Sequence, residues 1–184
     1  MSLKLITAPS LDPVTLEEMR EYLRADGAEF DITIPRLIKA AREAAQNYQN
    51  RAFYTQTWEL SFDVFPRMPL KIPLPPLQNL VSVKYTDKDG TEKAMNLNDF
   101  IVDKRSEPGR IAFKQGKSWP SVELQPIDSV VIQFTAGYTD INKIPNTVKL
   151  AYMVFIAHRH DNPGSEDIPQ AFYSLLGPER VVPV

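Results

Sequence analysis

Apolar residues recur every three or four positions through about residues 14–52, the spacing of helices that bury one face. Thr15 followed by Glu18 forms a capping box, which predicts a short helix that ends at Asp26-Gly27. A longer helix is predicted over about residues 33–51, with Pro35 in its first turn, where the missing amide hydrogen is tolerated. Two helices therefore open the chain.

The face of the second predicted helix that lies opposite its apolar residues is polar. It carries Arg36, Lys39, Arg42, Glu43, Gln46 and Asn50. This face is either solvated or set against a neighbouring subunit, and the residue pattern leaves both interpretations open.

From residue 55 the hydrophobic period changes to two, which is the mark of a half-buried strand. Residues 80–97 predict a strand, a turn around Asp87 to Gly90 and a returning strand. Further short strands are expected at residues 100–103, 110–113 and 129–135. Five prolines between Pro66 and Pro76 predict a rigid connection with few backbone donors.

The helical period returns after Pro145, and a last short helix is expected before Gly177-Pro178. Strands in series with short turns favour an antiparallel arrangement. We therefore predict an α+β fold, in which a small helical core from both chain ends carries a β-rich insertion between the second and third helices. A single domain is expected over residues 1–184, with helical parts at about 14–52 and 145–177 and the insertion at about 55–136.

Composition excludes several classes of protein. The chain has no cysteine, which removes disulfide frameworks, zinc ribbons and thiol catalysis. Its formal charge of −2 gives no global basic field for nucleic acid, so any contact with DNA must be local or loose. No membrane span or signal peptide is evident. Sixteen prolines against seven glycines favour a stiff scaffold over an enzyme with mobile loops.

The cluster that most resembles a metal-binding or catalytic site is His158, His160 and Asp161. A metal-dependent hydrolase that uses these three residues is the alternative from a different functional class. On a helix, residues two apart point roughly 200° away from each other, so His158 and His160 would hold one metal only if the helix had already ended. Phosphate-binding and nucleophile motifs are not evident, and no cofactor is expected.

Several segments, taken in order, carry a family resemblance. They are "PVTLEEMREYLRAD", "LIKAAREAAQNYQNRAF", "TQTWELSFDVFP", "IPLPPLQNLVSVKYTDKDG", "PGRIAF", "VVIQFTAGY", "IPNTVKLAYMVFIAH" and "LLGPERV". Together they resemble the head-tail connector (adaptor) proteins of tailed bacteriophages, specifically the gp6-like and phiE125 gp8-like group. The stretch "HRHDN" departs from the pattern of that group.

The resemblance implies a structural virion protein that assembles as a ring, typically of twelve subunits, beneath the portal. Such a ring extends the channel for passing double-stranded DNA, without sequence recognition, and docks the stopper or tail. The implied location is the head-tail interface of the virion, and the host cytoplasm during assembly. A tail-completion or stopper protein is the alternative among virion proteins.

The resemblance also suggests two surfaces. One is the polar face with Arg36, Lys39, Arg42 and Glu43, for subunit contacts or the channel wall. The other is an apolar C-terminal segment for docking to the portal, whose alternative interpretation is a frayed terminus. That segment consists of Glu179, Arg180, Val181, Val182, Pro183 and Val184.

Overall fold

A computed structural model describes residues 1–28 and 30–182 of the chain. The chain divides into two compact units. The β unit consists of Met1–Pro9 and Thr55–Gly137, and the helical unit consists of Ser10–Tyr54 and Tyr138–Val184. The chain therefore passes from one unit to the other three times. The prediction of a single connector domain stays a prediction.

The main sheet of the β unit has five strands in the order β1-β2-β8-β4-β5, and all the pairs are antiparallel. The strands are β1 (Ser2–Thr7), β2 (Gln56–Phe62), β4 (Leu77–Thr86), β5 (Glu92–Ala94) and β8 (Val130–Ala136). Alternate residues of β8 are fully buried, as the two-residue period predicts. The hairpin of β4 and β5 confirms the turn expected at Asp87 to Gly90, where Gly90 takes a positive φ of 81°.

A second, three-stranded sheet has the order β3-β7-β6. Its strands are β3 (Leu70–Ile72), β6 (Phe100–Asp103) and β7 (Gly109–Phe113), and the helical turn η1 (Leu97–Asp99) precedes β6. Gly109 lies against Leu77 of the main sheet so closely that an added Cβ would come within 2.6 Å of the Leu77 Cβ. The two sheets therefore share one core. Its fully or nearly fully buried members include Leu60, Ile72, Val83, Ile111, Ile132 and Phe134.

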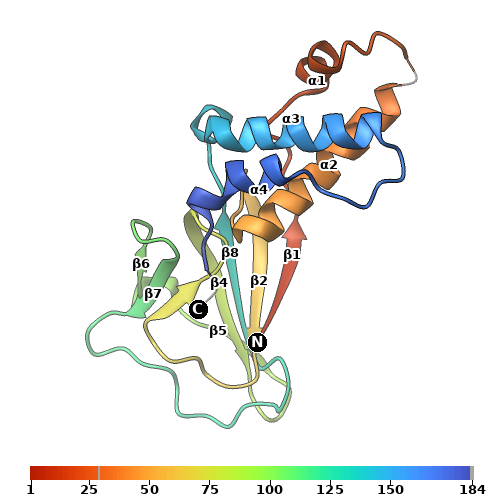
Figure 1. The fold of residues 1–184 in the computed structure, drawn as a ribbon. Helices are drawn as coiled ribbons and strands as arrows, with labels where there is room; N and C mark the ends of the chain where they lie inside the picture. The colour runs from red at the N-terminus through yellow and green to blue at the C-terminus, as the bar shows by residue number, and fades with distance from the viewer. Residues whose placement is uncertain (29, 183–184) are drawn as a thin grey trace. The chain divides into compact units, whose positions relative to one another are not determined.

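Four α-helices form the helical unit (Figure 1). They are α1 (Leu16–Leu23), α2 (Phe30–Gln49), α3 (Asn146–Asp161) and α4 (Gln170–Leu176), with helical turns η2 (Ile141–Lys143) and η3 (Gly177–Glu179). The capping box of Thr15 and Glu18 is present. Helices from both ends of the chain share one core, whose members include Ile34, Ile38, Ala45, Tyr152, Ile156 and Phe172. The α+β class and the helical core from both chain ends are thus confirmed.

Some elements differ from the sequence-based prediction. β1 was not predicted, and it forms one edge of the main sheet. β3 lies inside the proline-rich connection, where no strand was expected. α2 begins at Phe30, slightly earlier than expected, so Pro35 lies just past the first turn. Within the described residues, no helix combines the length and the apolar character needed to cross a membrane.

Candidate functional site

The polar face of α2 is an exposed stripe. Ile34, Ile38, Ala41 and Ala45 turn into the core of the helical unit. Residues at the complementary helical spacing are exposed, and we call them the outer stripe: Ile32, Arg36, Lys39, Glu43 and Asn47. Three of the four predicted surface residues, Arg36, Lys39 and Glu43, therefore lie together on one accessible face of the helix.

Arg42 has a different position from its three predicted companions. Its side chain is mostly buried, and its Nη1 donates a 2.9 Å hydrogen bond to Oδ1 of Asp12. Asp12 belongs to the segment that precedes α1, so this ion pair fastens that segment to α2. Arg42 thus contributes to the fold of the helical unit and is not part of the outer stripe.

The C-terminal segment is attached to the end of α2. The Val181 amide donates to the Gln49 carbonyl at 2.9 Å, and Asn50 Nδ2 donates back to the Val181 carbonyl at 2.8 Å. Arg51 Nε donates to the Glu179 carbonyl at 2.7 Å. The last carbonyls of a helix lack partners inside the helix, and the returning chain supplies one to Gln49.

Arg180 reinforces this attachment. Its Nε donates to the Tyr48 carbonyl at 3.0 Å, and its guanidinium carbon lies 4.9 Å from the centre of the Tyr48 ring. Val182 is the first residue beyond these bonds, and its side chain is exposed. Pro183 and Val184 lie outside the described residues. Docking of this segment to the portal stays a prediction, and Glu179 to Val181 already have partners within the helical unit.

His158, His160 and Asp161 all lie in the last turns of α3, which ends at Asp161. The two histidines are therefore both helical, and their side chains diverge. The His160 ring packs 5.2 Å from the Phe30 ring, whereas Nε2 of His158 is buried and has no hydrogen-bond partner. Among the described residues, no group of three or more His, Cys, Asp or Glu side chains could hold a metal ion. The arrangement gives the hydrolase alternative no support.

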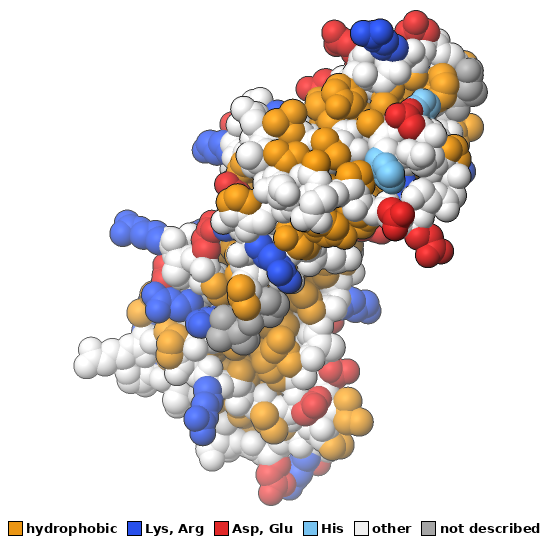
Figure 2. Space-filling model, in the orientation of Figure 1, with side chains coloured by type: hydrophobic (Ala, Val, Ile, Leu, Met, Phe, Trp, Pro, Cys, Tyr) orange, Lys and Arg blue, Asp and Glu red, His pale blue; other side chains and the backbone are white. Residues whose placement is uncertain are grey.

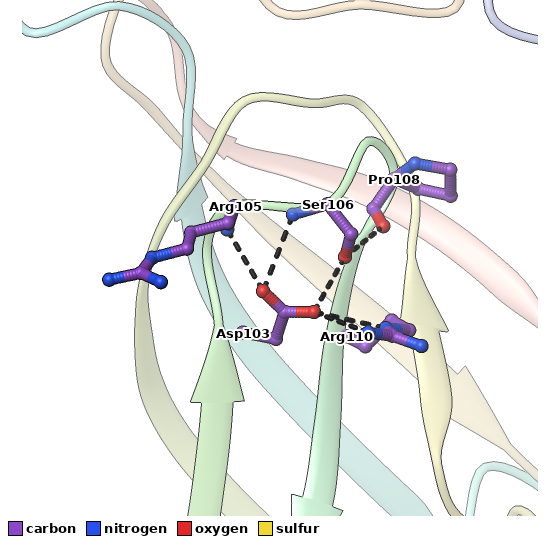
Figure 3. A network of polar contacts seen from close by, with 5 residues as sticks. All are labelled: Asp103, Arg105, Ser106, Pro108 and Arg110. Carbon is purple, nitrogen blue, oxygen red and sulfur yellow. Dashed lines mark hydrogen bonds and ion pairs between the residues drawn. The ribbon is translucent and has the colours of Figure 1, made fainter.

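The hairpin of β6 and β7 holds a polar network that the sequence analysis missed (Figure 3). Oδ1 of Asp103 accepts hydrogen bonds from the backbone amides of Arg105 at 3.0 Å and Ser106 at 3.3 Å. Its Oδ2 accepts from Ser106 Oγ at 2.9 Å and from Nε and Nη2 of Arg110 at 3.1 and 2.7 Å. The Arg110 guanidinium, followed by the amide of Arg105, holds the pKa of Asp103 well below its usual range. This carboxylate organises the whole turn.

A similar carboxylate shapes the turn between β4 and β5. Oδ1 of Asp87 accepts from the amides of Asp89 and Thr91, and Oδ2 lies 2.8 Å from Nζ of Lys93. The Lys93 ammonium lowers the pKa of Asp87. Both oxygens of Asp87 are thus engaged by the hairpin itself, which accounts for this acidic turn as local structure.

The fold resembles that of chains in gene transfer agent particles. It superimposes with a TM-score of 0.80 on a chain from the virion of a native gene transfer agent particle, at 20% sequence identity. It matches chains from the neck of the empty particle computed with C6 symmetry and of the native particle computed with C12 symmetry, at TM-scores of 0.79 and 0.80. In each case the alignment covers 100% of this chain and 97% of the other, again at 20% identity for the neck chains.

Comparison of the sequence with protein families gives the assignment. No curated protein matches the chain. The model of the head completion protein family, in contrast, matches residues 13–165, which include α1, α2, α3 and all the strands except β1. This match confirms the resemblance to phage head-tail connectors and the structural role at the head-tail junction that it implied. The chain belongs to the head completion protein family.

Proposed function

We propose that this protein is a ring-forming adaptor of the phage neck. In this proposal twelve copies assemble beneath the portal, extend the channel through which double-stranded DNA passes, and dock the stopper or tail. The observation that carries the proposal is the match of the entire chain to a neck chain computed with C12 symmetry, at a TM-score of 0.80. The family assignment supports the same location in the virion.

The structure offers features that suit such a ring. A head-to-tail ring needs two different complementary surfaces on each subunit, and the outer stripe of α2 is one candidate. It combines an apolar side chain with charged ones, because Ile32 is 63% exposed and is followed by Arg36, Lys39 and Glu43. Both kinds of contact are found in protein interfaces.

We further infer that the role is structural and non-enzymatic. The family is one of head completion, and the polar networks of Asp87 and Asp103 are closed within their own turns. Their acidic side chains hold hairpins in place. Binding to the portal, to the stopper or tail and to passing DNA would be the activity of the protein, without a cofactor.

Electron microscopy of the concentrated protein tests the proposal most directly. We expect rings with a central hole, alone or after addition of the purified portal, and co-sedimentation with the portal. Protein that stays monomeric at every concentration and never co-sediments with the portal would overturn the proposal. Binding to purified tail tube but not to the portal would instead identify a stopper or tail-completion protein.

A further inference from the structure

Charge is distributed unevenly along this chain. Residues 65–76 and 99–118 contain β3, β6, β7 and the loops beside them, and they carry seven Lys and Arg against three Asp and Glu. These segments have a net charge of +4, whereas the whole chain has −2, so the rest of the chain carries −6. A local positive region on an acidic protein is informative, because it does not follow from the overall composition.

Strand register places three of these charges in one row across the small sheet. Lys71 pairs with Arg110, and Arg110 pairs with Asp103. Paired residues share a face of the sheet, and their neighbours Ile72 and Ile111 on the opposite face are fully buried. The row therefore faces outward. In Figure 2, Lys and Arg side chains project from the region where Figure 1 shows β6 and β7.

The turn between β6 and β7 adds two more exposed cations, Lys104 and Arg105. Nζ of Lys104 donates to Oδ1 of Asn79 at 2.7 Å, so this ammonium meets a neutral partner. The Arg105 side chain points away from the Asp103 network, as Figure 3 shows. We call Lys71, Lys104, Arg105 and Arg110 the cationic face.

The cationic face carries more positive charges than the neighbouring acidic side chains neutralise. Asp103 already accepts hydrogen bonds from Arg110 and Ser106 and from the Arg105 amide. Among the described residues, the side chains of Lys71 and Arg105 have no anionic partner. Like charges directly opposite each other across strands destabilise a sheet, and Lys71 lies directly opposite Arg110. A polyanion bound from outside would compensate this repulsion.

We propose that the cationic face binds the phosphate backbone of double-stranded DNA without reading its sequence. This inference rests on the proposed neck function and names the surface that DNA meets. Lysine is depleted in the cores of protein-protein interfaces, whereas DNA-binding surfaces are strongly positive. The Asp103 network fixes the hairpin and holds the Arg110 fork in place, so part of the face is ordered before binding.

The experiment compares two double variants that lose the same charge. Lys71→Gln/Arg105→Gln removes the two unpartnered cations of the cationic face, and Lys4→Gln/Lys143→Gln removes two exposed cations that lie outside both the cationic face and the outer stripe. Fluorescence anisotropy with two labelled 30-base-pair duplexes of unrelated sequence is followed between about 50 and 200 mM salt, a range over which phosphate contacts weaken strongly. The oligomeric state of each protein is matched by sedimentation velocity.

We expect the unsubstituted protein to bind both duplexes equally, with an affinity that falls steeply as salt rises. Removal of two phosphate contacts is expected to reduce the slope of log K against log salt by about 1.8, because each contact contributes about 0.9. The Lys4→Gln/Lys143→Gln variant should bind within about twofold of the unsubstituted protein, since the site is local. A charge-conserving variant, Lys71→Arg/Arg105→Lys, should restore both the slope and the affinity.

Three results would overturn the inference. The first is equal DNA binding by the cationic-face variant and the unsubstituted protein, and the second is equal weakening by both double variants, which would show an effect of net charge alone. The third is unchanged DNA binding together with loss of rings or of portal binding, which would assign the face to an acidic protein surface. Ring formation is measured separately by electron microscopy, and DNA binding is measured by anisotropy. Failure of the neck function and failure of DNA binding therefore remain distinguishable.

Discussion

Nε2 of Gln49 donates a 2.7 Å hydrogen bond to the backbone carbonyl of Leu176, which lies 127 residues later in the chain. Gln49 is the last residue of α2 and Leu176 is the last residue of α4, and both are almost completely buried. The carbonyl at a helix end has no partner within its own helix. One buried amide thus joins the ends of two helices from opposite parts of the sequence.

Replacement of Gln49 by Leu is expected to destabilise the helical unit by about 1–3 kcal/mol, because it leaves the buried carbonyl of Leu176 without a donor. Urea unfolding followed by circular dichroism measures the change. The matched control is Asn47→Leu, an exposed position two residues earlier on the same helix. Equal stability of the two variants would show that the bond contributes nothing.

Gly109→Ala is expected to destabilise the β unit by about 1–3 kcal/mol through overpacking, because the new Cβ would lie 2.6 Å from the Leu77 Cβ. Thermal unfolding compares it with Gly116→Ala. Gly116 has open space around it but a φ of 77°, so its replacement adds only backbone strain of about 1 kcal/mol. A larger loss of stability at Gly116 than at Gly109 would contradict the close packing of the two sheets.

The depressed pKa of Asp103 predicts a specific loss of stability in acid. Its folded pKa lies below the unfolded value of about 3.9, so the stabilisation is fully present above the unfolded pKa and is lost progressively as the pH falls from there toward the folded pKa. We expect the urea midpoint of the native protein to fall more between pH 6 and pH 3 than that of Asp103→Asn. Asp87, whose pKa is also lowered, remains in both proteins. Parallel acid profiles would remove the assigned role of Asp103.

Charge reversal on the outer stripe, Arg36→Glu/Lys39→Glu, is expected to prevent ring assembly while leaving thermal stability nearly unchanged, because both side chains are exposed. Sedimentation velocity at high concentration, with and without the portal, measures assembly. The control is Lys4→Glu/Lys143→Glu, which changes the net charge equally at two other exposed positions. Loss of rings in both variants would point to net charge as the cause.

Added zinc or manganese is expected to leave the melting temperature unchanged, because His158 and His160 diverge on α3 and His160 packs on Phe30. Differential scanning fluorimetry with and without each metal provides the measurement. His160→Ala should lower the melting temperature through the lost ring contact, both with and without metal. A metal-dependent rise in the native protein that disappears in this variant would restore the hydrolase hypothesis.

Local patterns predicted most of the elements, since the information for them lies within a few residues. The Thr15 and Glu18 spacing identified the cap of α1, and alternation around Leu60 identified β2. Strand order could not be predicted, because it depends on pairing between residues that are far apart in the sequence. Ile132 of β8, for example, pairs with both Leu60 of β2 and Val83 of β4. β1 was missed for a related reason: its alternation is short, and its partner β2 begins almost fifty residues later.

The candidate surfaces could be predicted only in part. Helical periodicity correctly grouped Arg36, Lys39 and Glu43, but it could not separate Arg42, whose partner Asp12 lies thirty residues earlier. The bonds between Val181 and the end of α2 are equally non-local. The cationic face depends on the pairing of Lys71 with Arg110, which a linear pattern does not reveal.

The three crossings of the chain between its units have a consequence for inheritance. A gene fragment that encodes residues 55–137 would lack β1, so β2 would become a bare edge with unpaired backbone groups. A fragment from residue 10 onwards would have the same defect. Neither unit can be transferred between genomes as one uninterrupted cassette, because each is built from two separate segments of the chain.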